Sequence, residues 1–484
     1  MNQGNKVVKS FIWKLLERFG VLGIQFVLQI ILARILDPAH YGALSMMIIF
    51  TTLANVFIQN GFNTALIQNK DTTEEDYSSV FWVSLAIAGV LYAVIFVTAP
   101  FIAAFYAMPD IVAPLRVLAL MLFPGALNSV QLAKVRRELD FKKVFVSNIG
   151  GVVLSGVVGI AIALNGGGLW ALVAQTMLNV FVVCVVMFIT VKWRPRFVIN
   201  LGRVKVLFSF GWKLLVSGLI DTLYQDLRSL VIGKKYDSAT LGYYNRGKQF
   251  PQFIINAVNG TVQSVMLPVM AAKQDKRDEV KQMMRRSISL SAYIIFPMMA
   301  GLAACSAPII SLLLTDKWLP CVPYMQIYCF TLAFYPVHSC NLQTINAMGR
   351  SDMFLKLEIV KKTYGILALV IAVFCFDSPI AIAMTGVITT LLSCFVNAHP
   401  NKKIVGYSYF EQMKDILPAF ALSVFMFACV YAVQFIGLSS ILTLLIQIPV
   451  GVVVYLVGSA VFRLDSFKYV LNTVRSITKN KKTM

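Results

Sequence analysis

Apolar residues dominate this chain in long runs, which short polar, Gly- or Pro-containing segments interrupt. A run of about 20 apolar residues is long enough to cross the hydrocarbon core of a bilayer as an α-helix. Breaking the runs at glycine, proline and clustered charges predicts about fourteen such helices. They are expected at residues 10–35, 41–67, 79–106, 111–133, 144–164, 168–190, 209–233, 245–271, 287–314, 319–347, 355–376, 379–398, 414–436 and 439–462.

The composition agrees with this pattern. Of the 484 residues, 58% are hydrophobic and 13% are charged, and the mean hydropathy is +0.75. So few charged side chains cannot cover the surface of a soluble protein that holds this much apolar area. The predicted fold class is therefore an all-α integral membrane protein.

The distribution of basic residues predicts the orientation. The chain holds 43 Lys and Arg against 22 Asp and Glu. Of the basic residues, 34 lie at the two chain ends and on alternate connections, 5 lie on the other connections, and 4 lie within the predicted spans. Because basic loops remain in the cytoplasm, both termini are expected there, which requires an even number of spans. The first helix carries no cleavage signature and is expected to be retained. No basic run alternates with aromatic residues on a soluble module, so nucleic acid is not an expected partner.

An internal repeat relates the two halves of the chain. The segment Ser10–Leu16 recurs as Ser209–Leu215, with six of seven residues identical. Further on, an offset of 200 pairs Asp37 with Asp237 and Gly42 with Gly242, and an offset of 213 pairs Asn128 with Asn341. Two parallel copies of six helices are typical of alternating-access transporters. The predicted division is an N-terminal lobe at 1–200, a C-terminal lobe at 201–403, and two added helices with a basic tail at 404–484.

Polar residues recur with helical spacing inside the first two predicted helices of each lobe. Polar groups at membrane depth are costly and usually face a partner or a water-filled cavity. Either they are hydrogen-bonding contacts between helices, or they line a hydrated cavity between the lobes. The candidate cavity residues are Arg18, Gln25, Gln29, Asn55, Gln59, Asp221, Tyr224, Arg228, Arg246, Gln249 and Asn256.

The charges on these stripes favour an anionic ligand. Arginine suits phosphate in particular because its planar guanidinium binds two oxygens at once. Asp221 is expected to hold or relay charge beside Arg18, Arg228 and Arg246. Arg246 lies near the outer end of its helix, where extension of its side chain to the membrane surface is the alternative.

Other motifs favour structural roles. The small residues Gly151, Ser155 and Gly159 predict close helix packing. Four acidic residues within 71–76 predict a solvated loop, and Trp82, Trp170, Trp193 and Trp318 are expected to anchor span ends at the membrane interface. The eight cysteines are scattered singly and three histidines lie far apart, so no metal site and no cofactor are predicted.

Several motifs together resemble the start of the Wzx-type polysaccharide flippases, a family of the multidrug/oligosaccharidyl-lipid/polysaccharide (MOP) exporter superfamily. In the first lobe these are Leu32-Ala-Arg-Ile-Leu-Asp-Pro38, Tyr41-Gly42, Asn60-Gly61, Ala65-Leu-Ile-Gln68, Lys70-Asp71 and Phe81-Trp82. In the second lobe they are Leu241-Gly-Tyr-Tyr-Asn-Arg246, Gln249, Leu267-Pro268, Lys317-Trp318 and Gly349-Arg350-Ser-Asp352. The resemblance looks closest to the lipopolysaccharide, colanic-acid and teichuronic-acid exporter branch.

This resemblance implies a bacterial inner-membrane flippase that moves undecaprenyl-pyrophosphate-linked oligosaccharides by alternating access. It implies cationic residues in a central cavity, with Arg18 and Arg246 on the corresponding helices. Polysaccharide polymerase and assembly proteins are the implied partners, and the sequence does not decide between H⁺ and Na⁺ as a coupling ion. Two alternatives stay open: a drug/cation antiporter of the same superfamily, and a membrane polysaccharide polymerase or ligase, which the short external loops disfavour.

Overall fold

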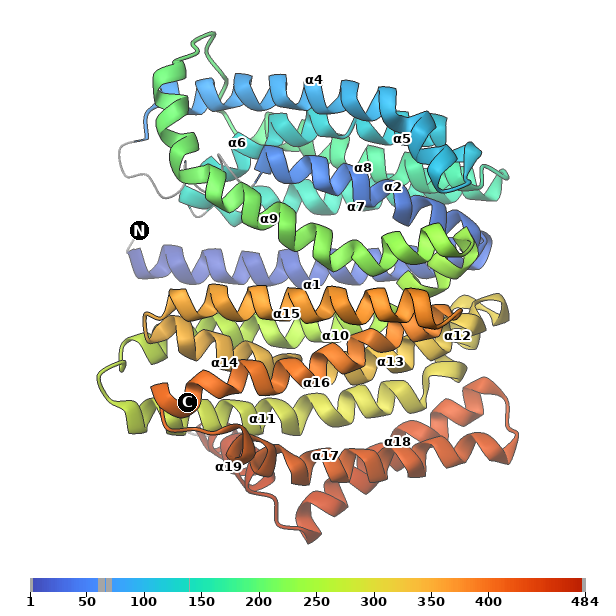
Figure 1. Ribbon diagram of the computed structural model, residues 1–484, viewed down its shortest axis with the longest axis vertical. Coiled ribbons are helices and arrows are strands. Elements are labelled where there is room, and N and C mark those ends of the chain that lie inside the picture. Colours follow the sequence, from blue (N-terminus) through green and yellow to red (C-terminus); the bar gives the residue numbers. More distant parts are fainter. Residues whose placement is uncertain (1–2, 60–65, 67–71, 139, 481–484) are drawn as a thin grey trace. The chain divides into compact units, whose positions relative to one another are not determined.

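The computed structural model describes the backbone of residues 3–59, 66, 72–138 and 140–480 (Figure 1). Within that backbone, side chains are not described at 3–12, 14–19, 210, 257–265, 267–268, 351 and 473–480. All regular secondary structure in the described part of the chain is helical.

Fifteen α-helices account for most of the described chain that precedes the C-terminal additions, together with short 3-10 turns. The first half holds α1 (Gln3–Ile35), α2 (Pro38–Gln59), α4 (Glu74–Phe105), η1 (Pro109–Ile111), α5 (Val112–Ala119), α6 (Leu122–Glu138), α7 (Phe141–Leu164) and α8 (Leu169–Thr190). The second half holds α9 (Leu201–Lys235), α10 (Ser238–Ala271), α11 (Arg277–Ala304), α12 (Ser306–Leu314), η2 (Asp316–Cys321), α13 (Val322–Ala333), α14 (Tyr335–Ala347), α15 (Ser351–Cys375) and α16 (Pro379–Ile404). The C-terminal additions are α17 (Tyr409–Ala432), η3 (Val433–Ile436), α18 (Ser440–Val461) and α19 (Asp465–Asn480).

The helices are those of a membrane protein. Within the described ranges, nine helices are long and apolar enough to cross a bilayer, and a tenth joins them if α9, bent by 54°, counts as one span. On α4, the outward-facing side chains of Val90, Val97 and Phe101 are more than half exposed. Such a continuous apolar face is stable against lipid and unfavourable against water. Each of the fourteen expected segments is helical, apart from short breaks, wherever the structure describes it.

The helix boundaries keep the offsets of the sequence repeat. The turn between α1 and α2 lies at residues 36–37, and the turn between α9 and α10 lies at 236–237, an offset of 200. The break between α5 and α6 is followed by Leu122, and the break between α13 and α14 is followed by Tyr335, an offset of 213. The repeat is therefore visible both in residue identities and in the positions where helices are interrupted. Binding sites of transporters are commonly built at interrupted helices.

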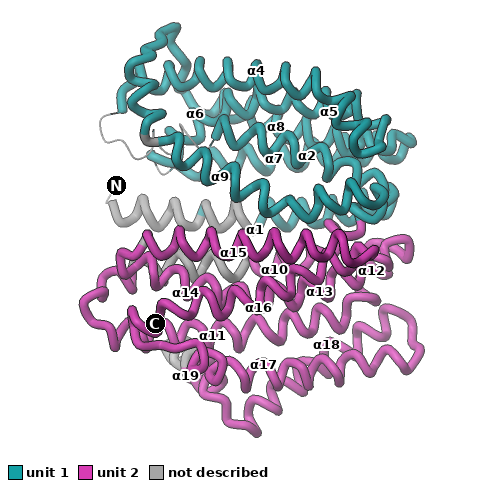
Figure 2. The backbone as a smooth tube through the Cα atoms, viewed as in Figure 1, with its two compact units in different colours: residues 1–242 teal, residues 243–484 magenta. Residues whose placement is uncertain are grey.

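Two compact units make up the chain, residues 1–242 and 243–484 (Figure 2). The first unit includes α9, which packs on α2 and on α4. The boundary between the units thus lies after the end of α9, whereas the second copy of the sequence repeat already begins within α9, at Ser209. The division at 200 and 403 describes the repeat and stays a prediction.

The N-terminal ends of the repeat-related helices α2 and α10 contact each other through two glycines, both within the first unit. A Cβ atom on Gly42 would lie 1.7 Å from the Ser238 carbonyl oxygen, and one on Gly242 would lie 2.1 Å from the Pro38 carbonyl oxygen. Neither position has room for a side chain, because atoms that are not bonded to each other do not approach so closely. The glycine retained at offset 200 thus has a steric reason in both copies.

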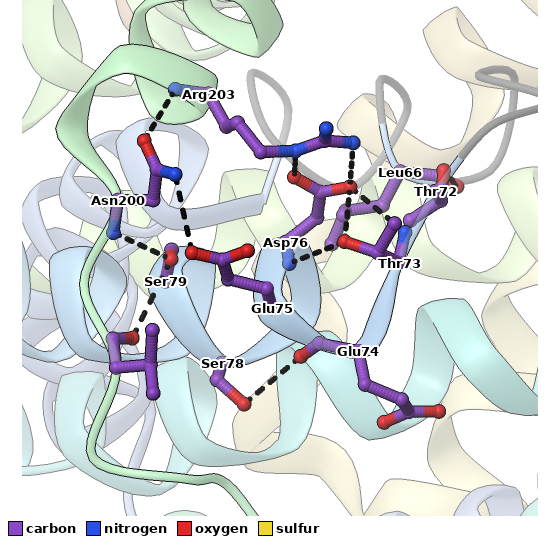
Figure 3. Close-up of polar contacts among 11 residues, drawn as sticks. Leu66, Thr72, Thr73, Glu74, Glu75, Asp76, Ser78, Ser79, Asn200 and Arg203 are labelled. Carbon is purple, nitrogen blue, oxygen red and sulfur yellow. Dashed lines mark hydrogen bonds and ion pairs between the residues drawn. The ribbon is translucent and has the colours of Figure 1, made fainter.

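The segment between α8 and α9 is bound to the first turns of α4 (Figure 3). Thr73 caps α4 through a reciprocal bond with Asp76, and Asp76 accepts two hydrogen bonds from the Arg203 guanidinium, one of them 2.7 Å long from Nη2. Asn200 donates its backbone N–H to Ser79 Oγ and its side-chain amide to Glu75. These contacts attach the connecting segment to the helix along two turns.

The acidic residues at 74–76 therefore do not form the predicted solvated loop. They are the first turn of α4, where carboxylates interact favourably with the helix dipole, and Asp76 is only 1% exposed. Trp193 donates to Glu74 and packs with Tyr77 and Phe81 in a buried cluster. Trp193 is thus a core residue and not an interfacial anchor.

We expect Arg203→Ala to destabilise the protein, because the buried Asp76 carboxylate would lose its charged donor. The expected loss is about 1–3 kcal/mol in the free energy of unfolding. Arg350→Ala is the matched control, since Arg350 also binds an aspartate, Asp352, through two nitrogens, but that pair is about half exposed on both sides. An exposed pair of this kind contributes little to stability.

Heat-induced unfolding of the two purified variants in one detergent measures the difference. A clear fall in the midpoint is expected for Arg203→Ala and little change for Arg350→Ala. Equal midpoints in the two variants would contradict a structural role for the contact between Asp76 and Arg203.

Candidate functional site

An amide-lined cavity lies inside the first unit, among α2, α6, α7 and α8. Its volume is about 260 Å³. Five amide side chains and one hydroxyl contribute to its wall, and the other lining residues are apolar or glycine. The lining residues are Asn55, Gln59, Met121, Gly125, Asn128, Ser129, Leu132, Asn148, Asn179, Val180 and Val183.

The amides converge because helices approach closely at glycines. A Cβ atom on Gly151 of α7 would lie 2.6 Å from Asn179 Oδ1 of α8. On α6, a Cβ atom on Gly125 would lie 3.3 Å from Asn55 Oδ1. Small residues allow membrane helices to approach this closely. The close packing predicted from Gly151, Ser155 and Gly159 is therefore found at Gly151.

The hydrogen bonds around the cavity leave acceptor capacity unused. Gln59 Nε2 lies 3.4 Å from Asn55 Oδ1, at the long end of hydrogen-bond distances. Asn128 Oδ1 is buried and accepts no hydrogen bond from any described residue. Because a buried acceptor without a donor is costly, such an atom indicates a position for water or a polar ligand. An amide has both a donor and an acceptor, so this wall suits a neutral, hydroxyl-rich group.

The repeat-related residue of the second unit has its amide satisfied. Asn341 on α14 corresponds to Asn128, and its Nδ2 donates to Gln412 Oε1 of α17 over 2.8 Å. Its Oδ1 accepts from Asn401 Nδ2 of α16, also at 2.8 Å. The added helix α17 therefore provides an amide partner for Asn341. The repeat-related positions therefore differ: Asn128 lies at a polar cavity, whereas the Asn341 amide is hydrogen-bonded at both its nitrogen and its oxygen.

Arg246 lies in the second unit, on α10, and is 5% exposed. Its Nη1 donates to Gln249 Oε1 over 2.7 Å, and its guanidinium carbon lies 5.0 Å from the centre of the Trp318 ring. The alternative that this side chain extends to the membrane surface is therefore wrong. Trp318, in η2, is fully buried, so it is not the interfacial anchor that its position near a span end predicted.

The other predicted site residues are distributed over both units. Asp221 on α9 is exposed and accepts from Gln225 Nε2 over 2.9 Å, and Asn256 on α10 is exposed and accepts from Gln252 Nε2 over 2.9 Å. The half-buried residues are Gln25, Gln29, Tyr224 and Arg228. The side chain of Arg18 lies outside the described residues. A single cavity shared by all these residues stays a prediction.

Sequence reasoning found two of the amides around the cavity and missed three. Asn55 and Gln59 were identifiable because they recur on one face of α2. Asn148 and Asn179 are single amides on otherwise apolar stretches, without a helical pattern that would identify them. Asn128 carried a signal only through the repeat, where it pairs with Asn341.

Comparison of the sequence with known proteins identifies relatives in several bacteria. The succinoglycan biosynthesis transport protein ExoT of Rhizobium meliloti is 24% identical over 85% of this chain and 81% of its own length. The teichuronic acid biosynthesis protein TuaB of Bacillus subtilis is 25% identical, over 84% and 85% respectively. The lipopolysaccharide biosynthesis protein WzxC of Escherichia coli is 23% identical, over 87% and 86%.

Comparison of the structure with solved structures identifies transporters with a similar fold. A lipid II flippase, MurJ, in an inward closed conformation matches with a TM-score of 0.72 and 14% identity, covering 93% of this chain and 98% of its own. An inward-facing multidrug resistance MATE transporter of the MOP superfamily matches with a TM-score of 0.57 and 16% identity, covering 84% and 94%. The Wzx-type resemblance is also confirmed by sequence, since the family model described as "Polysaccharide biosynthesis protein" matches residues 31–323, more than half of the chain. The chain therefore belongs to this polysaccharide biosynthesis protein family.

Proposed function

We propose that this protein moves a lipid-linked oligosaccharide from one leaflet of a bacterial inner membrane to the other by alternating access. The substrate class is an oligosaccharide on undecaprenyl pyrophosphate, a precursor of a surface polysaccharide. Family membership, relatives named for the synthesis of three polysaccharides, and a fold shared with a lipid II flippase support this proposal.

The amide-lined cavity is the observation in the structure that carries the proposal. A glycan that leaves water must exchange its hydrogen bonds with water for others, and each unmade bond to a buried group costs about 1–3 kcal/mol. Asn and Gln side chains offer donors and acceptors without charge, so they can bind sugar hydroxyls and release them again. The cavity of about 260 Å³ accommodates part of a glycan and not a whole repeating unit.

The cavity chemistry disfavours the antiporter alternative. A transporter of cationic drugs is expected to present acidic residues to its ligand. None of the described residues that line the amide cavity is acidic. The relatives are also named for transport or biosynthesis of polysaccharides rather than for drug export. We therefore prefer a glycan substrate, and we propose no catalytic reaction.

The buried arginine of the second unit is proposed to attract the pyrophosphate. Arg246 already holds its guanidinium close to Trp318, and its hydrogen-bond acceptor Gln249 is exposed. A charged donor held in an apolar environment interacts strongly with phosphate. Arg18 and Arg228 are proposed to contribute on the first repeat-related pair of helices, with Asp221 beside them.

We further propose fourteen spans with both termini in the cytoplasm. The test is cysteine labelling of intact cells at Asn165 and at Lys276, which are both exposed and lie on opposite sides in this topology. The background carries Cys375→Ser, because Cys375 is the exposed one among the native cysteines. A membrane-impermeant reagent is expected to label position 165 only. Labelling of both positions, or of position 276 alone, would contradict the topology.

The cavity is tested by Asn128→Leu in cells that lack the native gene. Leucine has the same branched arrangement of four non-hydrogen atoms, so protein amount and stability should be retained, since the buried Oδ1 has no donor to lose. Export of surface polysaccharide is expected to fall by roughly tenfold, the effect of one or two lost hydrogen bonds to the substrate. Oligosaccharide on undecaprenyl pyrophosphate should accumulate in the inner leaflet.

Asn165→Leu is the matched control, because Asn165 is an exposed amide of the same unit outside the cavity. Its export should equal that of the native protein. Native export by Asn128→Leu at equal protein level would remove the cavity from the mechanism.

Arg246→Lys separates charge from geometry. Lysine keeps the positive charge but cannot offer two parallel donors to a phosphate. We expect export to fall roughly tenfold or more, in line with the 1.5–3 kcal/mol of a hydrogen bond to a charged group. Arg350→Lys, at an exposed pair, is the control. Unchanged export by Arg246→Lys, with protein level and unfolding midpoint also unchanged, would show that Arg246 does not bind the substrate.

A further inference from the structure

A second polar cavity lies in the second unit, at the ends of α11, α17 and α18. Its volume is about 610 Å³. Four basic residues line it, Arg285, Arg286, Lys414 and Arg463, against the two acidic residues Asp415 and Asp465. The wall is therefore net positive, and it is separate from both the amide cavity and Arg246.

Neighbouring groups already neutralise part of this charge. Asp415 accepts a hydrogen bond of 2.6 Å from Arg285 Nη2 and another of 2.6 Å from the Tyr407 hydroxyl. Asp465 lies 3.9 Å from Lys468. Among the described residues, neither Lys414 nor Arg463 forms an ion pair. The positive charge available to a ligand is therefore concentrated on these two side chains, with Arg286 beside them.

Arg463 occupies a backbone position that normally belongs to glycine. Its φ angle is +49°, and it follows the C-terminus of α18, where its N–H donates to the Ala460 carbonyl and that of Leu464 donates to the Ser459 carbonyl. This is the pattern in which glycine is preferred after a helix. Other turns of the chain do use glycine in this conformation, Gly349 and Gly437 among them. Ala107 and Thr315 also have a positive φ, but of these three residues Arg463 alone lines this basic cavity, which makes its side chain a candidate for binding.

The surroundings of the cavity match the boundary between lipid and water. Val461 and Phe462, at the end of the apolar helix α18, are 69% and 70% exposed. The chain then turns at Arg463 into α19, whose sequence places Phe467, Val470, Leu471, Val474 and Ile477 at the spacing of one helical face. Such a helix lies along the membrane surface.

An aromatic contact attaches this helix to the cavity wall. The Arg286 guanidinium lies 3.7 Å from the centre of the Tyr469 ring, so α19 packs against α11 beside the basic residues. A cation over an aromatic ring is attracted by the negative face of the ring. The cavity thus has a basic wall, an exposed apolar edge on α18 and an amphipathic helix along one side.

We propose that this cavity binds the phosphate of an anionic phospholipid, with Lys414 and Arg463 as the main donors. A phospholipid meets both features of the site at once, because its phosphate reaches the basic side chains while its acyl chains lie along the exposed end of α18. Basic pockets of this kind, between helices at the membrane surface, suit anionic headgroups. The inference depends on the membrane location of α17 and α18 and not on the transported substrate.

The test compares the double variant Arg463→Gly/Lys414→Ala with the native protein in detergent. Glycine relieves the strained turn, so the variant without lipid should unfold at the same temperature as the native protein or higher. The unfolding midpoint is then measured with added phosphatidylglycerol, with phosphatidylcholine, and with inorganic phosphate at the same concentration. The control variant Lys402→Ala/Lys403→Ala removes two exposed basic residues outside the cavity.

Phosphatidylglycerol is expected to raise the midpoint of the native protein and of the control, and phosphatidylcholine is not. In the double variant the affinity for phosphatidylglycerol should fall roughly tenfold or more, since two charged contacts are lost. An equal response of the double variant and the native protein would overturn the proposal. So would equal responses to the two lipids, or a full response to inorganic phosphate alone, which would identify a site for free phosphate.

Discussion

The structure depends on one constraint: a polar group inside a membrane needs a partner within the protein. Lipid tails offer no hydrogen bonds, so the backbone satisfies itself by forming helices. Side chains face the same demand, and many of them meet it within their own unit. Ser147, Thr176 and Thr190 donate to carbonyls one turn earlier in their own helices, and Gln447 donates to the Val430 carbonyl of the neighbouring helix. Buried polar atoms without a hydrogen-bond partner, such as Asn128 Oδ1, are the exceptions.

The two repeats satisfy the constraint differently at one pair of equivalent positions. In the second unit Asn341 contacts Gln412 and Asn401, so the added helix α17 provides one of its hydrogen-bond partners. In the first unit Asn128 occupies the corresponding position, but its Oδ1 lies at a cavity lined by other amides. An amide bonded at both ends stabilises one packing arrangement, whereas one that faces a cavity can accept a ligand. The addition of α17 and α18 therefore changes the chemistry of the second copy.

Charged residues at helix ends show the same contrast. Asp76 and Arg203 bind each other closely and join the segment before α9 to α4, so their charges serve the fold. Lys414 and Arg463 line a cavity without such a partner among the described residues. A charge that is already paired within the protein has less to gain from a ligand. Unpaired charges on a cavity wall are therefore better candidates for binding. Burial and pairing, rather than residue type, separate the two groups.

The sequence by itself determined the class of the protein and the course of its chain. Long apolar runs must become helices in lipid. The repeat at offsets of 200 and 213 predicts where the turns and breaks between helices recur, as at residues 36–37 and 236–237. These properties are local or periodic, so a single sequence carries them. The polar face of α2 was readable for the same reason, which is why Asn55 and Gln59 were found.

Only the tertiary structure decided which polar residues meet. Asp76 was predicted to be solvated, yet it is buried because Arg203, more than a hundred residues later, folds back onto it. Arg246 was expected to be able to reach the membrane surface, yet Trp318 covers it. Asn179 joins the cavity because Gly151 lets α7 and α8 approach. Each of these outcomes depends on contacts between distant segments, and helical periodicity contains no information about the partner that a face will find.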